Sequence, residues 1–149
     1  MGMEPVEFLK LAKDLCKQSN NEAALRSAIS RGYYALFNLA KQFIEKHVHK
    51  LPKGAESHKK VYLYLNHCNL VKVQDIAGDL NDLRDDRNDA DYDLSTDKFE
   101  DSNVVNLLFA KARASYNDFQ DFVSNANNRK KLINGIAEYR KKISQGSPF

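Results

Sequence analysis

The chain has 149 residues, of which 42% are hydrophobic and 29% charged, and its formal net charge at pH 7 is +3. A chain of this length suits one domain, which buries roughly two-thirds of the surface that it exposes when unfolded. No uninterrupted apolar run approaches the roughly 18 residues that a membrane-spanning helix needs, so we expect no contact with a membrane. We expect a single domain over residues 1–149.

The cysteines and histidines form no recognisable disulfide or ligand pattern. Cys16 and Cys68 are the only cysteines and lie far apart, which favours buried thiols in a reducing compartment. The four histidines include no helical pair four residues apart, and there is no paired CxxC motif. The segment MGMEPVEFLK lacks the basic and apolar regions of a secretion signal. We therefore expect a cytoplasmic protein with no metal site and no cofactor.

The apolar residues of the first half recur at intervals of three and four, which predicts helices. Pro5 lies in the first turn of the first predicted helix, and QSNN ends it. Asn20 or Asn21 is predicted to cap a second helix that continues to about His47. This second helix is apolar on more than one side, so we expect it to be central.

The second half of the chain continues the helical pattern. Ser57 is predicted to cap a short helix, because its alternating VYLYL segment would have no partner as an isolated strand. A long helix follows from about Val71 to near Asp91, and Ser95 or Thr96 is predicted to cap the next one. NANNRKK interrupts that helix, and a last helix frays into SQGSPF. The predicted fold is all-α, an antiparallel bundle of about five helices with short connections.

The charges are unevenly distributed along the chain. Residues 75–101 hold 11 acidic and 3 basic side chains, net −8, and the remainder holds 20 basic and 9 acidic, net +11. This asymmetry suits a protein that pairs its own surfaces in a dimer, or one that presents a basic face to an anionic partner. The basic segment NNRKKLINGIAEYRKK could meet RNA phosphates, but the lack of interleaved aromatic residues favours the acidic region of a second copy.

Two of the predicted helices gather polar residues on one face. In the second helix Arg31, Tyr34 and Asn38 stand at positions i, i+3 and i+7, so they share a face. In the helix that starts near Val71, the same spacing aligns a second polar set, followed directly by Tyr92. This second set consists of Arg84, Arg87, Asn88 and Asp91.

Two interpretations of these faces stay open. In the first, Arg31 and Arg87 form a buried salt-bridge network with Asp91 that fixes the register of the helices. In the second, Arg84 and Arg87 hold a phosphate group in bidentate geometry.

Three segments occur in the order RSAISRGYYALFNLAK at residues 26–41, SHKKV at 57–61 and LRDDRNDADYD at 83–93. In these segments the sequence resembles the HEPN family, in particular its small stand-alone prokaryotic members. The resemblance covers residues 6–125, and residues 126–149 would add a C-terminal helix and tail. It implies a helical bundle that forms a homodimer with a polar groove at the interface. It also implies a minimal nucleotidyltransferase as partner, in a toxin–antitoxin pair.

Many HEPN proteins are metal-independent ribonucleases, in which a histidine follows the motif arginine after four to six residues. Here neither Arg84 nor Arg87 has such a histidine, because none occurs after His67. The motif is of the RxxADY kind, and Tyr92 is a candidate acceptor of a nucleotidyl group. We therefore expect a module associated with RNA or a nucleotide rather than an enzyme. Its candidate binding residues are Arg31, Tyr34, Asn38, Arg84, Arg87, Asn88, Asp91 and Tyr92.

Two alternative functions stay open. The chain could be an active ribonuclease toxin in which Arg87 works with Asp91 or His58, although an aspartate is a weak base at pH 7. It could also be a purely structural helical scaffold, in which the polar faces only hold the helices in register.

Overall fold

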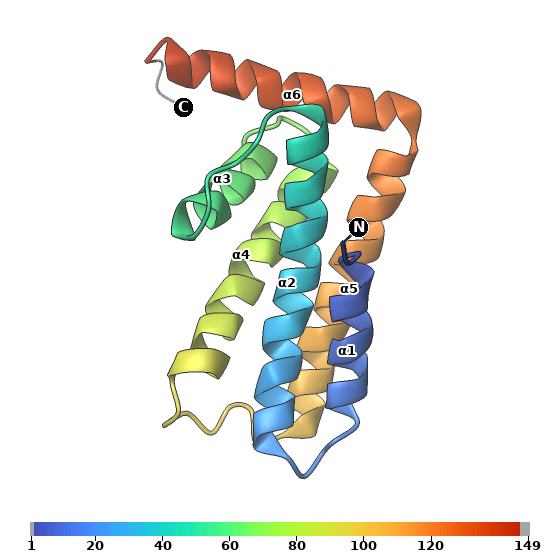
Figure 1. Ribbon diagram of the computed structural model, residues 1–149, viewed down its shortest axis with the longest axis vertical. Helices are drawn as coiled ribbons and strands as arrows, with labels where there is room; N and C mark the ends of the chain where they lie inside the picture. Colours follow the sequence, from blue (N-terminus) through green and yellow to red (C-terminus); the bar gives the residue numbers. More distant parts are fainter. Residues whose placement is uncertain (1, 147–149) are drawn as a thin grey trace. The chain divides into compact units, whose positions relative to one another are not determined.

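The computed structural model describes residues 2–146, and these residues form six α-helices and no strand (Figure 1). The helices are α1 (Val6–Cys16), α2 (Glu22–His47), α3 (Ala55–Asn66), α4 (Val71–Tyr92), α5 (Ser102–Ser124) and α6 (Ala126–Ser144). The all-α class is confirmed, but the expected number of about five helices was too low. The VYLYL segment lies within α3 and is helical, as expected. The end of the predicted frayed tail, residues 147–149, lies outside the described residues.

The described residues group into two compact units, and three helices contribute to both. The first unit contains residues 2–39 and 79–116, and the second contains residues 40–78 and 117–146. The helices α2, α4 and α5 continue from one unit into the other. Within residues 2–146, no helix combines the length and the apolar character that crossing a membrane requires. The single domain over residues 1–149 stays a prediction.

The first unit is built from α1 and from parts of α2, α4 and α5. Its segment of α2 runs antiparallel to both α1 and its segment of α4 (Figure 1). Leu25, Ile29, Phe99 and Tyr116 are among the buried side chains of its core. Gly32 allows α2 to approach α5 closely, because a Cβ atom there would lie 3.3 Å from the Cβ of Ala112. The helical faces that carry the candidate residues belong to this unit.

The structure confirms the cap predicted at the start of α2 and the break predicted within NANNRKK. The side-chain oxygen of Asn21 accepts the backbone N–H of Ala24 at 3.1 Å, at the start of α2. The segment NANNRKK contains the break between α5 and α6, where the side chain of Asn125 accepts the N–H of Asn128 at 3.0 Å. Each cap satisfies one of the N–H groups that a helix start leaves without an intrahelical partner.

Two other predicted caps were wrong. The helix predicted to follow Ser95 or Thr96 begins only at Ser102, where the Asp101 carboxylate accepts the N–H of Asn103 at 2.8 Å. Ser95 and Thr96 instead make local turn contacts that keep this stretch out of the helix. Ser57 lies inside the first turn of α3, where its hydroxyl donates to the carbonyl of Gly54 at 2.7 Å.

The second unit contains α3 and α6, which pack against each other, together with the remaining parts of α2, α4 and α5. Phe43 and Phe119 meet edge to face in its core, with ring centroids 5.8 Å apart. Tyr64 of α3 and Tyr139 of α6 are both buried and also meet edge to face, at 6.1 Å. Aromatic pairs of this geometry add to the free energy gained by burying the rings.

Candidate functional site

All eight predicted binding residues lie in the first unit, on α2 and α4. Five side chains of this unit form what we call the arginine–tyrosine cluster. They are Arg31, Tyr33, Tyr34, Arg84 and Arg87. Sequence reasoning misses Tyr33, because a buried tyrosine on a central helix is indistinguishable there from an ordinary core residue.

Two guanidinium groups of the cluster, those of Arg31 and Arg87, lie over aromatic rings. The Cζ atom of Arg87 lies 5.3 Å from the ring centroid of Tyr33 and 5.3 Å from that of Tyr34. The Cζ atom of Arg31 lies 5.1 Å from the ring of Tyr34 and 5.1 Å from the ring of Phe8 in α1. Arg87 is only 8% exposed, so its charge is largely removed from water. Stacking of this kind fixes the guanidinium plane and stabilises each contact by about 0.5–2 kcal/mol.

Tyr33 lies close to the positive charges of Arg84 and Arg87. Its side chain is 1% exposed, and burial strongly raises the pKa of its hydroxyl, while the nearby charges of Arg84 and Arg87 act in the opposite direction. Burial is the largest of these effects, so the Tyr33 hydroxyl stays protonated and neutral at pH 7. The cluster therefore contains positive charge that the Tyr33 side chain does not offset.

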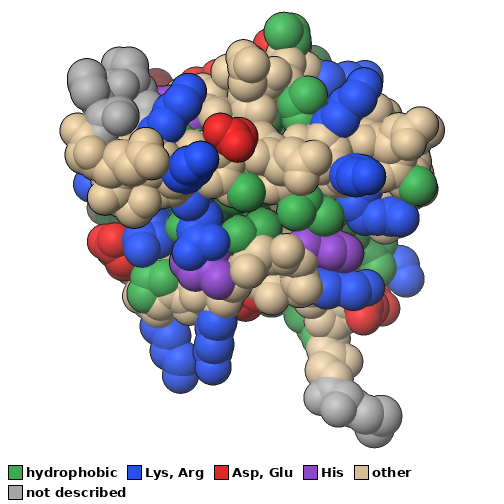
Figure 2. Space-filling view, turned by 90° about the horizontal axis from the view of Figure 1, so that it is seen from above, with side chains coloured by type: hydrophobic (Ala, Val, Ile, Leu, Met, Phe, Trp, Pro, Cys, Tyr) green, Lys and Arg blue, Asp and Glu red, His purple; other side chains and the backbone are tan. Residues whose placement is uncertain are grey.

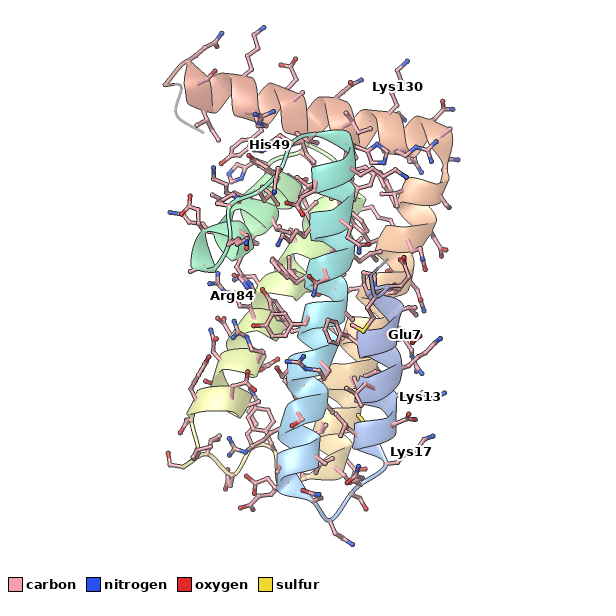
Figure 3. The ribbon with its side chains drawn as sticks, viewed as in Figure 1. Glu7, Lys13, Lys17, His49, Arg84 and Lys130 are labelled. Atoms are coloured by element: carbon pink, nitrogen blue, oxygen red, sulfur yellow. The ribbon has the colours of Figure 1, made fainter. Side chains whose placement is uncertain are left out.

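The arginines of the cluster have no acidic partner in the part of the chain that the structure describes. No Asp or Glu among residues 2–146 lies within ion-pair distance of Arg31, Arg84 or Arg87. The Nε atoms of Arg84 and Arg87 are buried without a hydrogen-bond partner, and within residues 2–146 they are the only such side-chain atoms. Arg84 extends from α4 (Figure 3). A buried charge without a counter-ion is costly, and an anion bound here would supply the missing negative charge.

The expected salt-bridge network of Arg31 and Arg87 with Asp91 is not formed. The Ser30 hydroxyl donates to Oδ2 of Asp91 at 3.2 Å, and Nη2 of Arg31 donates to the oxygen of the same hydroxyl at 3.3 Å. Arg31 is thus linked to Asp91 only through Ser30. Arg87 takes no part, because its guanidinium group lies against the tyrosine rings. Asp91 itself is exposed.

The remaining predicted residues are Asn38, Asn88, Tyr92 and His58. The Asn38 side-chain amide donates to the carbonyl of Tyr34 on its own helix at 2.8 Å. Asn88 is half-buried on α4, and Tyr92 is 75% exposed at the last residue of that helix. His58 is half-buried on α3, in the second unit. The exposure of Tyr92 leaves its hydroxyl accessible from solvent.

Arg26 is a structural residue that the sequence interpretation missed. Its Nη1 donates to the carbonyls of Ala90 and Asp93 at 3.1 and 2.8 Å, and its Nη2 donates to that of Thr96 at 3.0 Å. Its Nε pairs with Glu22 at 2.8 Å, and its side chain is 9% exposed. A helix end leaves its last carbonyls without intrahelical partners, and Arg26 provides those partners at the end of α4. From the sequence, Glu22 and Arg26 look like an ordinary surface pair four residues apart.

Among residues 2–146, no group of three or more His, Cys, Asp or Glu side chains is arranged to hold a metal ion. The chain matches no protein-family model, no curated protein and no solved structure with which it was compared. An assignment of function therefore rests on the motifs of the chain and on the geometry of the arginine–tyrosine cluster.

Proposed function

We propose that the chain is a HEPN-like helical module that binds a phosphate group of RNA or of a nucleotide in the arginine–tyrosine cluster, without cleaving the ligand. The observation that carries the proposal is the convergence of Arg31, Arg84 and Arg87 with no acidic partner among the described residues. A purely structural network would be expected to neutralise such charges internally, because unpaired buried charges destabilise a fold.

The chemistry of these side chains suits a phosphate. A guanidinium group presents several N–H donors in a rigid plane that matches two phosphate oxygens. The rings of Tyr33 and Tyr34 hold the Arg87 plane in a fixed orientation, so less rotational freedom remains to be lost on binding. The Nε atoms of Arg84 and Arg87 have no acceptor among the described residues, so an anion close to these guanidinium groups would offset charge that is otherwise poorly compensated.

Binding without cleavage is supported by the absence of a proton carrier in the motif. No histidine follows His67 in the sequence, and Asp91 accepts a hydrogen bond from Ser30. Tyr33 stays protonated at neutral pH, because burial raises the pKa of its hydroxyl. Cleavage beside a phosphate needs a group that takes the proton of the ribose 2′-hydroxyl. The ribonuclease alternative would need His58 or Asp91 in that role.

The proposed partners are a second copy of this chain and a minimal nucleotidyltransferase, as in toxin–antitoxin pairs. Both follow from the family resemblance, and the exposed Tyr92 hydroxyl is the proposed acceptor of a nucleotidyl group. Incubation with a minimal nucleotidyltransferase and ATP should form a bond between the Tyr92 oxygen and the α-phosphorus of ATP with release of pyrophosphate, which adds the mass of an adenylyl group to the chain. The Tyr92→Phe variant should gain none, and a gain equal to that of the wild type would place the modification elsewhere.

Binding of fluorescently labelled single-stranded RNA over a series of salt concentrations tests the proposal. The Arg84→Gln/Arg87→Gln variant should bind more weakly, and its salt dependence should fall by about one unit of slope for each phosphate that is no longer neutralised. Arg113→Gln is the matched control, because Arg113 is exposed on α5 and stacks on Phe109 instead. Equal affinities for all three proteins would refute the proposal. RNA cleavage that the double variant abolishes would favour the ribonuclease instead.

A further inference from the structure

A cavity with basic residues among its lining lies in the second unit, apart in sequence from the arginine–tyrosine cluster. We call it the α3–α6 groove; its volume is about 390 Å³, and it is lined by residues of α3 and α6 and by His49. This volume falls within the range of about 300–1,000 Å³ that is common for small-molecule sites. The polar residues used below are His49, Glu56, Lys59, Lys60, Tyr64 and Arg140.

The charge of this groove is strongly positive. Lys59, Lys60 and Arg140 line it together with one acidic residue, Glu56. Among the described residues, none of the three basic side chains lies within ion-pair distance of an Asp or Glu. The second unit as a whole carries 13 Lys or Arg against 6 Asp or Glu, net +7. Figure 2 shows Lys and Arg side chains gathered on the face that carries α6.

His49 lines the groove, and burial and the nearby positive charges lower its pKa. Its Nε2 lies 2.8 Å from the hydroxyl oxygen of the buried Tyr64. Burial lowers the pKa of His49, and the charges of Arg140 and Lys60 lower it further, whereas Glu45 acts in the opposite direction. The basic side chains of α3 and α6 are therefore close enough to the imidazole to disfavour a further positive charge there.

We propose that the α3–α6 groove binds an oligophosphate, a chain of two or three linked phosphates, through Lys59, Lys60 and Arg140. Three basic side chains on one small cavity are best complemented by a ligand that carries several negative charges within a few ångströms of one another. A chain of linked phosphates has this spacing of charge. The carboxylates of an acidic peptide are spaced along an extended backbone and match this arrangement less well. The His49 imidazole and the Tyr64 hydroxyl add polar partners at the same cavity.

Calorimetric titration with sodium tripolyphosphate tests this site. The Lys60→Gln/Arg140→Gln variant should bind about tenfold or more weakly, because it lacks two charge-assisted hydrogen-bond donors. Lys130→Gln is the matched control, because Lys130 lies on the same helix but outside the cavity and points outward from α6 (Figure 3). Its affinity should match that of the wild type. Equal reductions in both variants, or no wild-type binding at about 1 mM ligand, would overturn the proposal.

Two further arms identify the ligand and the place where it binds. ATP binding more tightly than tripolyphosphate would identify a nucleotide as the source of the phosphates, and equal affinities would identify the phosphate chain alone. Hexaglutamate binding as tightly as tripolyphosphate would overturn the proposal in favour of an acidic peptide. In NMR titrations, tripolyphosphate should raise the pKa of His49 in the Arg84→Gln/Arg87→Gln variant as in the wild type. Failure of the RNA-binding proposal would leave that result unchanged, whereas an unmoved His49 would contradict the groove site.

Discussion

Removal of the Arg26 side chain should destabilise the protein more than the removal of an ordinary surface arginine. Arg26 lies on α2, yet three of its donors reach the carbonyls of Ala90, Asp93 and Thr96. The Arg26→Ala variant therefore leaves the end of α4 and the following loop without their main partner. We expect the last turn of α4 to unfold and residues 93–96 to lose their fixed conformation.

The magnitude follows from the hydrogen bonds of Arg26. A hydrogen bond to a charged donor contributes about 1.5–3 kcal/mol, and bonds that share one guanidinium group are not additive. The Ala90 carbonyl is buried, so leaving it without a partner adds a desolvation cost. The Glu22 pair contributes little beyond this, because Glu22 is 40% exposed and solvent screens it. The lost hydrogen bonds and the unsatisfied Ala90 carbonyl together are expected to lower the free energy of unfolding of Arg26→Ala by about 3–5 kcal/mol.

Urea denaturation followed by circular dichroism measures this destabilisation. Arg26→Lys keeps the charge but not the planar set of donors, so it should fall between the wild type and Arg26→Ala. Glu22→Gln should change the free energy of unfolding by less than about 1 kcal/mol. A decrease below about 1 kcal/mol in Arg26→Ala, with unchanged hydrogen exchange at residues 93–96, would refute this role.

Two further predictions concern the second unit. A Cβ atom at Gly135 would overlap the backbone carbonyl oxygen of Cys68, so Gly135→Ala should lower the free energy of unfolding by about 1–3 kcal/mol in urea titrations. In the control variant Gly78→Ala, the new methyl group in α4 meets no neighbour, so the free energy of unfolding should rise by up to about 1 kcal/mol. Similar effects of both variants would contradict the close approach of Gly135 to the Cys68 carbonyl. Burial and nearby cations lower the pKa of His49 in the folded state, so the unfolded state binds more protons as pH falls. Stability should therefore decrease as pH falls below about 6.5, and His49→Gln should flatten that decrease; an unchanged slope would contradict it.

The sequence predicted the helices well, because their signals are local. The periodicity of apolar residues marked most of the helices, and α3 was predicted because its alternating segment would have been an unpaired strand. The side chains of Asn21 and Asn125 cap α2 and α6 where NN and NANN predicted breaks. The start of α5 was misplaced by several residues. Its cap competes with interactions from a distant part of the chain, since Arg26 binds the Thr96 carbonyl in the loop before it. Such tertiary interactions leave no trace in local sequence.

The sequence predicted which residues belong to the candidate site better than it predicted the contacts between them. Helical spacing brought Arg31 and Tyr34 to one face and Arg84 and Arg87 to another, and the structure places all four in one cluster. The same spacing also suggested an ion pair between Arg87 and Asp91. That pair is absent because Ser30 binds Asp91 and the tyrosine rings hold Arg87. Competition between partners on different helices decides such pairs, and spacing within one helix does not reveal it.

If the arginine–tyrosine cluster binds phosphate, function and stability oppose each other at Arg87. A methionine there keeps the apolar stem against Tyr33 and Tyr34 but removes a buried charge that lacks a counter-ion among the described residues. The cation–π attraction that methionine cannot provide, about 0.5–2 kcal/mol for each ring, is offset by the desolvation cost that the charge no longer incurs.

Paired measurements on Arg87→Met test the central claim most directly: the free energy of unfolding in urea and the affinity for single-stranded RNA at one salt concentration. The phosphate-binding account predicts a free energy of unfolding that is unchanged within about 1 kcal/mol or higher, together with RNA affinity reduced about tenfold. A scaffold role for Arg87 predicts the reverse. Marked destabilisation with unchanged RNA affinity would contradict the account.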